Sequence, residues 1–152
     1  MKKINSILRY LILNYPNKSD LSKTRVTKMV YLADWYFAKQ YNKQMTNIDW
    51  FFDHYGPYVP DVFQIAKSDE VLEIIKDTSL YGAPKSLISL KEGKSVPYNL
   101  SEREKSVIDQ VIEDTKYLTW NSFIRMVYDT EPIKYGKRYE TLDLVKYAQT
   151  AN

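Results

Sequence analysis

The stretch Ser22–Tyr41, SKTRVTKMVYLADWYFAKQY, decides the fold because it predicts a long helix at the centre of the domain. Ser22 has a side chain that can cap the first turn, and the apolar residues after it recur at the spacing of one helix face. Aromatic residues widen that face, so we expect the helix to be covered on more than one side. The face contains Val26, Met29, Val30, Ala33 and Phe37, and it is widened by Tyr31, Leu32 and Trp35.

The residues that follow this helix change to the period of a β-strand. Every second residue from Ile48 to Phe52 is large and apolar, which predicts a short strand. A break follows at His54–Pro57. Pro57 is expected in the first turn of the next helix, where its missing N–H costs nothing, and the apolar stripe of that helix runs from Val59 to Ala66.

Four further helices are predicted from apolar periodicity and from capping signals. They are a helix over residues 3–14 that Pro16 ends, a helix that begins at the Ser101–Glu104 capping box, a helix that Thr119 caps and Pro132 ends, and a short terminal helix over residues 142–148.

Two β-compatible runs lie between the helices, at Val71–Asp77 and Ser86–Lys91. The link Ser79–Lys85 has the composition of a hairpin turn, although Leu72–Ile75 would also fit the end of a helix. No repeat or linker divides the chain. The sequence therefore predicts one α+β domain over residues 1–152, predominantly α-helical, with about five or six helices and a small antiparallel sheet of two or three strands.

Composition excludes several classes of protein. The 152 residues contain no cysteine and one histidine, so a disulfide framework, a cysteine nucleophile and a histidine-rich metal site are all ruled out. No apolar run is long enough to span a membrane. Polar residues interrupt the apolar N-terminal stretch and no cleavage site follows it, so a signal peptide is not expected. We expect a cytoplasmic protein that contacts no membrane.

The small net charge of +3 hides an asymmetry along the chain. Residues 1–43 carry nine Lys/Arg and two Asp/Glu, whereas the remainder carries 13 and 17. Basic residues such as Arg25 and Lys28 are spaced among apolar ones, which is typical of the solvated face of an amphipathic helix. A DNA- or RNA-binding regulator that uses the basic residues from Lys18 to Lys39 is the alternative function, but nucleic acid is not the expected partner.

Catalytic signatures are weak. A serine elbow, a phosphate-binding glycine loop and a second histidine are all absent. Asp61, Glu92 and Lys94 match the P-D…E-x-K pattern of metal-dependent nucleases, but Glu92 and Lys94 fall in a polar turn and Asp61 in the first turn of a helix. Asp49 and Asp53 fit the solvent-facing half of a strand. We therefore expect no enzyme activity, no metal and no cofactor.

Aromatic density is the unusual feature of this sequence, with 14 tyrosines, three tryptophans and five phenylalanines. Five of these residues lie within residues 50–58, where Tyr55 and Tyr58 flank the rigid pair Gly56-Pro57. Exposed Tyr and Trp beside a fixed backbone are frequent anchors of protein interfaces. The last turn of the second helix, with its aromatic residues, is expected to pack beneath or beside this corner.

Two stretches resemble the Panacea domain, the SocA-like antitoxin family that is also described as phage-associated protein. They are Lys28-Met-Val-Tyr31-Leu-Ala-Asp34-Trp35-Tyr and Trp50-Phe-Phe-Asp-His-Tyr-Gly56-Pro57-Tyr58-Val59-Pro60-Asp61-Val62. The first is similar to the family's K-x-x-Y-L-A helix and the second to its aromatic stretch ending in G-P-x-x-P. The later order of predicted elements is also similar. Tyr128 and Pro132-Ile133 stand where family members often carry a histidine and a Pro-Trp pair, so no role of those residues transfers.

The resemblance implies a non-catalytic antitoxin of a toxin–antitoxin system, encoded beside its toxin on a phage or other mobile genetic element. Such a protein neutralises a cognate toxin by direct contact, and one branch of the family delivers its toxin to a AAA+ protease. The partner-binding residues that follow from the aromatic corner and from the resemblance are Tyr31, Asp34, Trp35, Trp50, Asp53, His54, Tyr55, Gly56, Pro57 and Tyr58.

Overall fold

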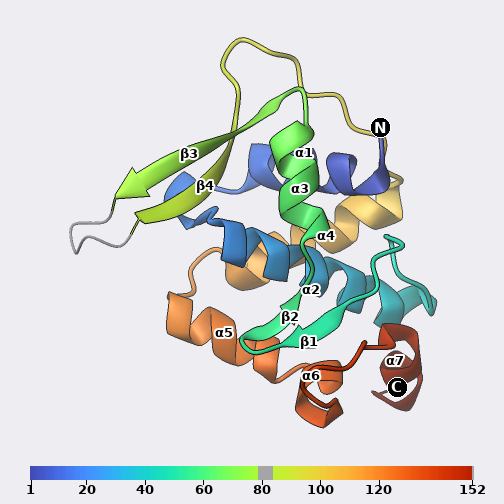
Figure 1. Cartoon of the computed structure of the whole chain (residues 1–152). Helices are drawn as coiled ribbons and strands as arrows, with labels where there is room; N and C mark the ends of the chain where they lie inside the picture. Colours follow the sequence, from blue (N-terminus) through green and yellow to red (C-terminus); the bar gives the residue numbers. More distant parts are fainter. Residues whose placement is uncertain (79–83, 152) are drawn as a thin grey trace.

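Figure 1 shows the computed structural model, which describes residues 1–78 and 84–151. In these residues seven α-helices, one short 3₁₀ helix and two antiparallel hairpins make a mostly helical α+β domain, as the sequence predicts. The helices are α1 Lys3–Asn14, η1 Lys18–Asp20, α2 Lys23–Tyr41, α3 Asp61–Ser68, α4 Glu102–Thr115, α5 Trp120–Tyr128, α6 Glu131–Tyr135 and α7 Leu144–Ala151. The strands are β1 Phe51–Asp53, β2 Gly56–Tyr58, β3 Leu72–Thr78 and β4 Pro84–Leu90.

Helix α2 occupies the middle of the molecule, which confirms the prediction of a central helix. The Ser22 hydroxyl accepts a hydrogen bond from Arg25 N at 3.2 Å and so caps the helix. The helix ends at Asn42, which adopts a left-handed conformation with φ of 58°. Helices α3, α4 and α7 and strands β2 and β4 all contact α2, so its wide apolar face is covered on more than one side.

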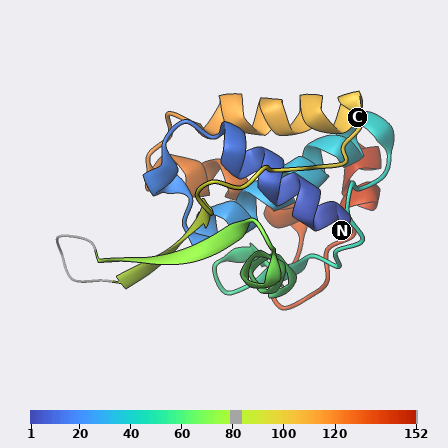
Figure 2. The same ribbon diagram turned by 90° about the horizontal axis from the view of Figure 1, so that it is seen from above.

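The other helices form layers around α2. Seen from above, α4 and α3 lie on opposite sides of the molecule, with α1 and α2 between them (Figure 2). Helix α1 contacts both α3 and α4. Among residues 1–78 and 84–151, no helix combines the length and the apolar character that crossing a membrane requires.

The hairpin of β3 and β4 projects from the body as an arm (Figures 1 and 2). Its register runs from Leu72 opposite Leu90 to Thr78 opposite Pro84, so residues 72–75 belong to a strand and do not finish a helix. The base of the arm is tied to the main body by a hydrogen bond from Ile88 N to Leu21 O at 2.9 Å. Of the turn predicted over Ser79–Lys85, residues 79–83 lie outside the described residues.

The second hairpin, which we call the corner hairpin, contains β1, the turn His54–Tyr55 and β2. Two expectations were wrong here. The strand begins at Phe51 instead of Ile48, because hydrogen bonds to Asp34 fix the backbone and side chains that precede it. Pro57 lies in β2 opposite Phe52, not in a helix, and α3 begins only at Asp61. The tight turn and the φ of +103° at Gly56 return the chain along β1 before a helix can start.

The capping signals of the later helices are confirmed. The Ser101 hydroxyl accepts a hydrogen bond from Glu104 N, and the Glu104 carboxylate accepts one from Ser101 N. Thr119 caps α5 in the same way, by accepting from Ser122 N. Pro132 does not end α5, which stops at Tyr128; it lies in the first turn of α6, where proline is favoured.

The interpretation of the basic residues as a solvated face was wrong for Arg25, which is only 3% exposed. Its guanidinium donates hydrogen bonds to Thr115 O at 2.9 Å and Leu118 O at 3.1 Å, and it stacks over the Phe123 ring. Arg25 therefore joins α2 to the end of α4 and to α5. Helical periodicity missed this role because an arginine among apolar residues is by default assigned to solvent.

Candidate functional site: the corner hairpin and its support

Asp34, near the middle of α2, is fully buried and holds the chain that leads into the corner hairpin. Its carboxylate accepts five hydrogen bonds, including those from Met45 N at 2.9 Å, Thr46 N at 3.0 Å and Trp50 Nε1 at 2.9 Å. Burial raises the pKa of Asp34, and the hydrogen bonds from Thr46, Trp50 and Met45 oppose that rise. These contacts fix the position of residues 44–50 and therefore the point at which β1 begins.

Tyr31 lies one turn before Asp34 and is also fully buried. Its hydroxyl is 2.8 Å from Thr130 Oγ1, between α5 and α6, and its ring meets that of Trp50 edge-on at 5.5 Å. Burial raises the pKa of the Tyr31 hydroxyl, so it stays protonated. Tyr31 and Trp50 thus pack the corner hairpin onto the centre of the domain.

Lys28 is the third polar residue of this helix face, and its burial is unexpected. Only 1% of the residue is exposed, so its assignment to a solvated face was wrong. Its ammonium donates one long hydrogen bond, at 3.5 Å, to Pro57 O in the corner hairpin. Burial lowers the pKa of Lys28 to about 8, and the carboxylate of Asp53 opposes the change. A helical wheel could have located it, because Lys28, Tyr31 and Trp35 share one face at spacings of three and four.

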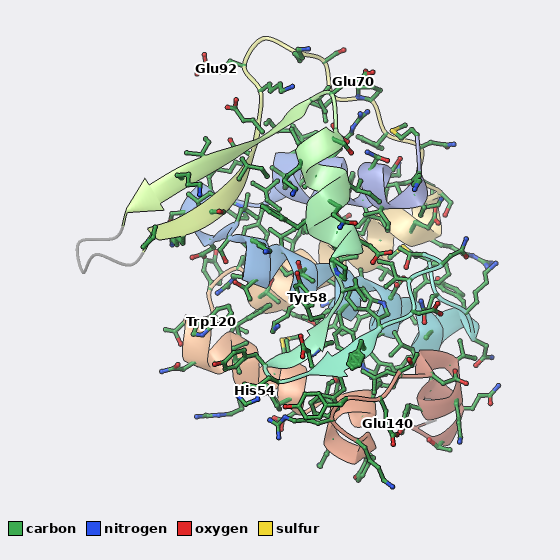
Figure 3. All side chains as sticks on the ribbon, viewed as in Figure 1. His54, Tyr58, Glu70, Glu92, Trp120 and Glu140 are labelled. Atoms are coloured by element: carbon green, nitrogen blue, oxygen red, sulfur yellow. The ribbon has the colours of Figure 1, made fainter. Side chains whose placement is uncertain are left out.

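The tip of the corner hairpin reaches solvent, whereas its base does not. Tyr55 is 74% exposed and His54 is exposed beside it, but Gly56 and Pro57 are buried. A Cβ at Gly56 would approach the Tyr128 ring to 3.5 Å, and φ of +103° at this position disfavours any side chain. In Figure 3, His54 marks the tip and Tyr58 lies near α2, at the other end of β2. The backbone around Tyr55 is therefore fixed while its ring is free to make contacts.

A segment from the C-terminal part of the chain completes the corner. Residues 138–142 run along β1, with Tyr139 N donating to Phe52 O at 2.6 Å and Phe52 N donating to Glu140 O at 3.0 Å. Arg138 Nε donates to His54 O, and the Tyr139 hydroxyl is 3.3 Å from His54 Nδ1. Tyr139 is 61% exposed and has a φ of +66°, which is uncommon for a bulky side chain. Sequence analysis missed this segment because it has neither a helical nor a strand-like apolar period.

A pocket of about 290 Å³ opens between α2 and the corner hairpin. It lies beside the exposed tip, since Tyr55 belongs to its lining. We call it the corner pocket; it is lined by Lys23, Thr24, Lys28, Asp53, Tyr55 and Tyr58.

The ten residues expected to bind a partner fall into two groups. Asp53, His54, Tyr55 and Tyr58 are exposed or half-buried, and the other six are buried. The residues from Tyr31 to Trp35 lie in the middle of α2 and not in its last turn, because the helix continues to Tyr41. Trp35 does not lie at the corner; it lines a separate groove of about 600 Å³ between α2 and α5. The structure therefore brings nine of the ten together around the corner hairpin, as surface and support.

The nuclease-like triplet is not assembled. Asp61 is the first residue of α3, at the end of that helix next to β2, whereas Glu92 lies in the turn after β4, beyond the other end of α3 (Figure 3). Across the described ranges 1–78 and 84–151, no group of three or more His, Asp or Glu side chains is placed to hold a metal ion.

Comparison with known proteins identifies a family. A family model described as "Antitoxin SocA-like, Panacea domain" matches residues 26–132. These residues include most of α2, the corner hairpin, α3, α4 and α5, and they exclude α1, α7 and the segment that runs along β1. No curated protein and no solved structure matches the chain significantly.

Proposed function

The chain belongs to the family of SocA-like antitoxins with a Panacea domain, and on this basis we propose that it neutralises a cognate toxin by direct protein–protein contact. The single observation that carries the site assignment is the contrast at the corner hairpin. A strongly exposed tyrosine ring is attached there to a backbone that buried residues hold in place. A rigid aromatic anchor contributes large contact area and loses little conformational freedom on binding.

In this proposal the toxin contacts the surface formed by Tyr55, Tyr58, His54 and Asp53, with Tyr139 at its edge. His54 and Tyr55 pack edge-on with ring centroids 4.5 Å apart, and His54 is also in contact with Tyr139. The exposed side chains thus form one continuous patch, and the contacts between their rings restrict their rotation. Interfaces commonly place most of their binding energy in a few such residues near the centre.

The buried residues of the motif have a positioning role in the same proposal. Asp34 and Trp50 fix the start of β1, and Lys28 contacts the backbone of Pro57. Asp34 and Trp50 offer no surface to a partner, because neither is exposed. Substitutions here would act on toxin binding through the position of the corner hairpin.

Several finer features of the function follow from the family and are part of the proposal. The antitoxin acts by binding alone, without catalysis, in the cytoplasm where its toxin is made. The gene of the toxin lies next to that of the antitoxin on a phage or another mobile element. Delivery of the bound toxin to a AAA+ protease would be seen as a shorter half-life of the toxin when the antitoxin is co-expressed.

The basic N-terminal third is the observation that favours the alternative of a DNA- or RNA-binding regulator. Against it, two cations of α2, Arg25 and Lys28, are buried and bonded to other parts of the domain. A recognition helix presents its cations to the groove of the nucleic acid. The observed burial therefore supports the antitoxin.

The test is growth rescue in cells that express the toxin from the adjacent reading frame. We expect the unchanged protein to restore growth, and Tyr55→Ala and Tyr58→Ala to fail while their thermal unfolding stays close to that of the unchanged protein. Tyr117→Ala is the matched control, because Tyr117 is 87% exposed, lies in the link between α4 and α5, and does not line the corner pocket. If both variants are folded and rescue growth fully, the corner hairpin has a structural role only and does not bind the toxin.

A further inference from the structure

The corner pocket is lined by more cationic side chains than acidic ones. Two of its lining residues, Lys23 and Lys28, are cations, and Asp53 is the only acid among them. One oxygen of Asp53 already accepts a hydrogen bond from His54 N at 2.9 Å, which holds this carboxylate to the turn of the corner hairpin. Lys23 is drawn toward a neighbouring ring, with its ammonium 4.5 Å from the centre of Phe63.

Lys28 at the wall of this pocket lacks the partners that a buried ammonium requires. An ammonium carries three N–H donors, but the part of the chain that the structure describes gives Lys28 one acceptor, the Pro57 carbonyl at 3.5 Å. Within residues 1–78 and 84–151, no carboxylate lies within 4.0 Å of its nitrogen. A charge removed from water is stable only when an opposite charge and further hydrogen bonds compensate it. Lys28 is therefore prepared for a group that the isolated chain does not supply.

We propose that the corner pocket receives a carboxylate of the toxin, from an Asp or Glu side chain or from a chain terminus, and pairs it with the ammonium of Lys28. The inference rests on the proposed antitoxin function and adds the chemistry of the contact. Thr24 offers a hydroxyl donor to the same group, and Tyr55 and Tyr58 enclose its methylene carbons. The site would give charge-based specificity to an interface whose area comes from the aromatic tip.

The size of the pocket agrees with this ligand. Its volume of about 290 Å³ corresponds to about ten water molecules, which is enough for a carboxylate with its carbons and for some retained water. The pocket is adjacent to the exposed tip, so a segment that contacts the Tyr55 ring can place an acidic side chain in the pocket at the same time.

The protonation of Lys28 gives a specific signature of binding. The charged and titratable groups that line the pocket with it are Lys23, Asp53, Tyr55 and Tyr58. Burial lowers the pKa of Lys28 to about 8, so in the free protein the ammonium is mostly protonated at neutral pH but loses its proton at a lower pH than an ordinary lysine. A carboxylate beside the nitrogen favours the charged form and raises this pKa.

The proposal is tested by ¹⁵N NMR of the lysine side chains in the full chain, titrated with the peptide acetyl-Gly-Glu-Gly-amide. The control probe is acetyl-Gly-Gln-Gly-amide, which has almost the same shape and no charge. We expect the Glu peptide to shift the Lys28 signal and to raise its pKa above 8, with the Gln peptide at least about tenfold weaker. Equal binding of the two peptides, or no shift with either, overturns the proposal.

Two variants keep the result interpretable. Lys28→Met should abolish the preference for the Glu peptide, and it replaces a buried charge by an apolar side chain of similar length, which folded domains usually tolerate. Asp53→Asn removes the acid that competes for Lys28 and should strengthen binding of the Glu peptide several-fold. If Asp53→Asn weakens binding, or if Lys28→Met keeps the preference, the carboxylate does not pair with Lys28.

The growth-rescue assay with the toxin distinguishes a failure of this inference from a failure of the proposed function. Rescue of growth by a protein that shows no Lys28-dependent binding of the Glu peptide would leave the antitoxin function standing and overturn the pocket. Lys28-dependent binding of the peptide without any rescue would retain a carboxylate site and overturn the toxin as the source of the carboxylate. We expect both readouts to be positive, and Lys28→Met to reduce rescue while the variant remains folded.

Discussion

Helix α2 buries three charged side chains, and two of them, Asp34 and Lys28, have very different surroundings. Asp34 accepts five hydrogen bonds, and every one comes from the segment 44–50 that it holds in place. Lys28 has one long hydrogen bond and borders a pocket. Both belong to the same sequence motif and lie on the same helix. The comparison teaches that a buried charge with several hydrogen bonds inside the chain builds the fold, whereas the single long hydrogen bond of Lys28 is the observation from which we infer a binding site.

The largest effect is expected from Asp34→Ala, which would test the structural half of this comparison. The substitution leaves Met45 N, Thr46 N and Trp50 Nε1 buried without an acceptor, so we expect a loss of about 3–5 kcal/mol of unfolding free energy. Urea denaturation measures it. Asp49→Ala is the control, because Asp49 is exposed and should change stability by less than about 0.5 kcal/mol. Equal stabilities of the two variants would show that Asp34 does not anchor the segment.

Removal of the charge of Lys28 is expected to stabilise the protein, whereas removal of the charge of Asp34 destabilises it. The reason is that the folded-state pKa of Lys28, about 8, is below its ordinary value of 10.5. Between these pH values the unfolded chain binds a proton that the folded chain has released, so the contribution of Lys28 to stability rises with pH. Lys28→Met should therefore be more stable than the unchanged protein at pH 7. Its advantage should shrink by about 2 kcal/mol by pH 10. Urea denaturation at both pH values measures this, and a constant difference would mean that Lys28 is not buried as a cation.

The difference between the two residues also shows what sequence reasoning can reach. Helix ends were predictable where a cap is local, as at Ser22, Thr119 and the Ser101–Glu104 box, because these contacts span three residues. The partners of Asp34 are ten to sixteen residues away, in a segment without regular structure. Apolar periodicity cannot predict these hydrogen bonds, because it describes only the pattern of residues within one helix or strand.

Two other parts of the site could not be predicted from the sequence, for related reasons. Strand β2 was missed because it contains Pro57, which normally argues against a strand, and it is tolerated in a hairpin of only three residue pairs. The segment at Tyr139 joins β1 from 87 residues further along the chain and carries no strand pattern. By contrast, the aromatic tip at Tyr55 could be identified from the density of aromatic residues beside Gly56-Pro57, and the structure places it on the surface.

A smaller effect is expected from Asp61→Asn, which tests whether an exposed acid next to the corner has any catalytic role. Asp61 is in the first turn of α3, where a carboxylate stabilises the helix by about 0.3–1 kcal/mol. We expect a stability loss within that range by thermal unfolding. Incubation of DNA with Mg²⁺ or Mn²⁺ should give no cleavage by either protein; cleavage that Asp61→Asn abolishes would restore the nuclease interpretation.

Binding of random duplex DNA should show no effect beyond the nonspecific level. If the cations of α2 serve the interior, as Arg25 and Lys28 do, the dissociation constant at physiological salt should be no tighter than roughly 10⁻⁴–10⁻⁶ M. A gel-shift assay with varied salt measures it. Sequence-dependent binding below one micromolar would make the nucleic-acid regulator the better account of this fold.

The most direct test of the central claim is the affinity of the purified toxin for Tyr55→Ala, measured by isothermal titration calorimetry beside the unchanged protein and Tyr117→Ala. Tyr55 is the exposed anchor on a fixed backbone, so its truncation should cost about 2 kcal/mol or more, a weakening of about thirtyfold, while the unfolding temperature stays nearly constant. Tyr117→Ala should bind as the unchanged protein does. If Tyr55→Ala is folded and binds the toxin within about twofold of the unchanged protein, the corner hairpin is not the surface that the toxin recognises.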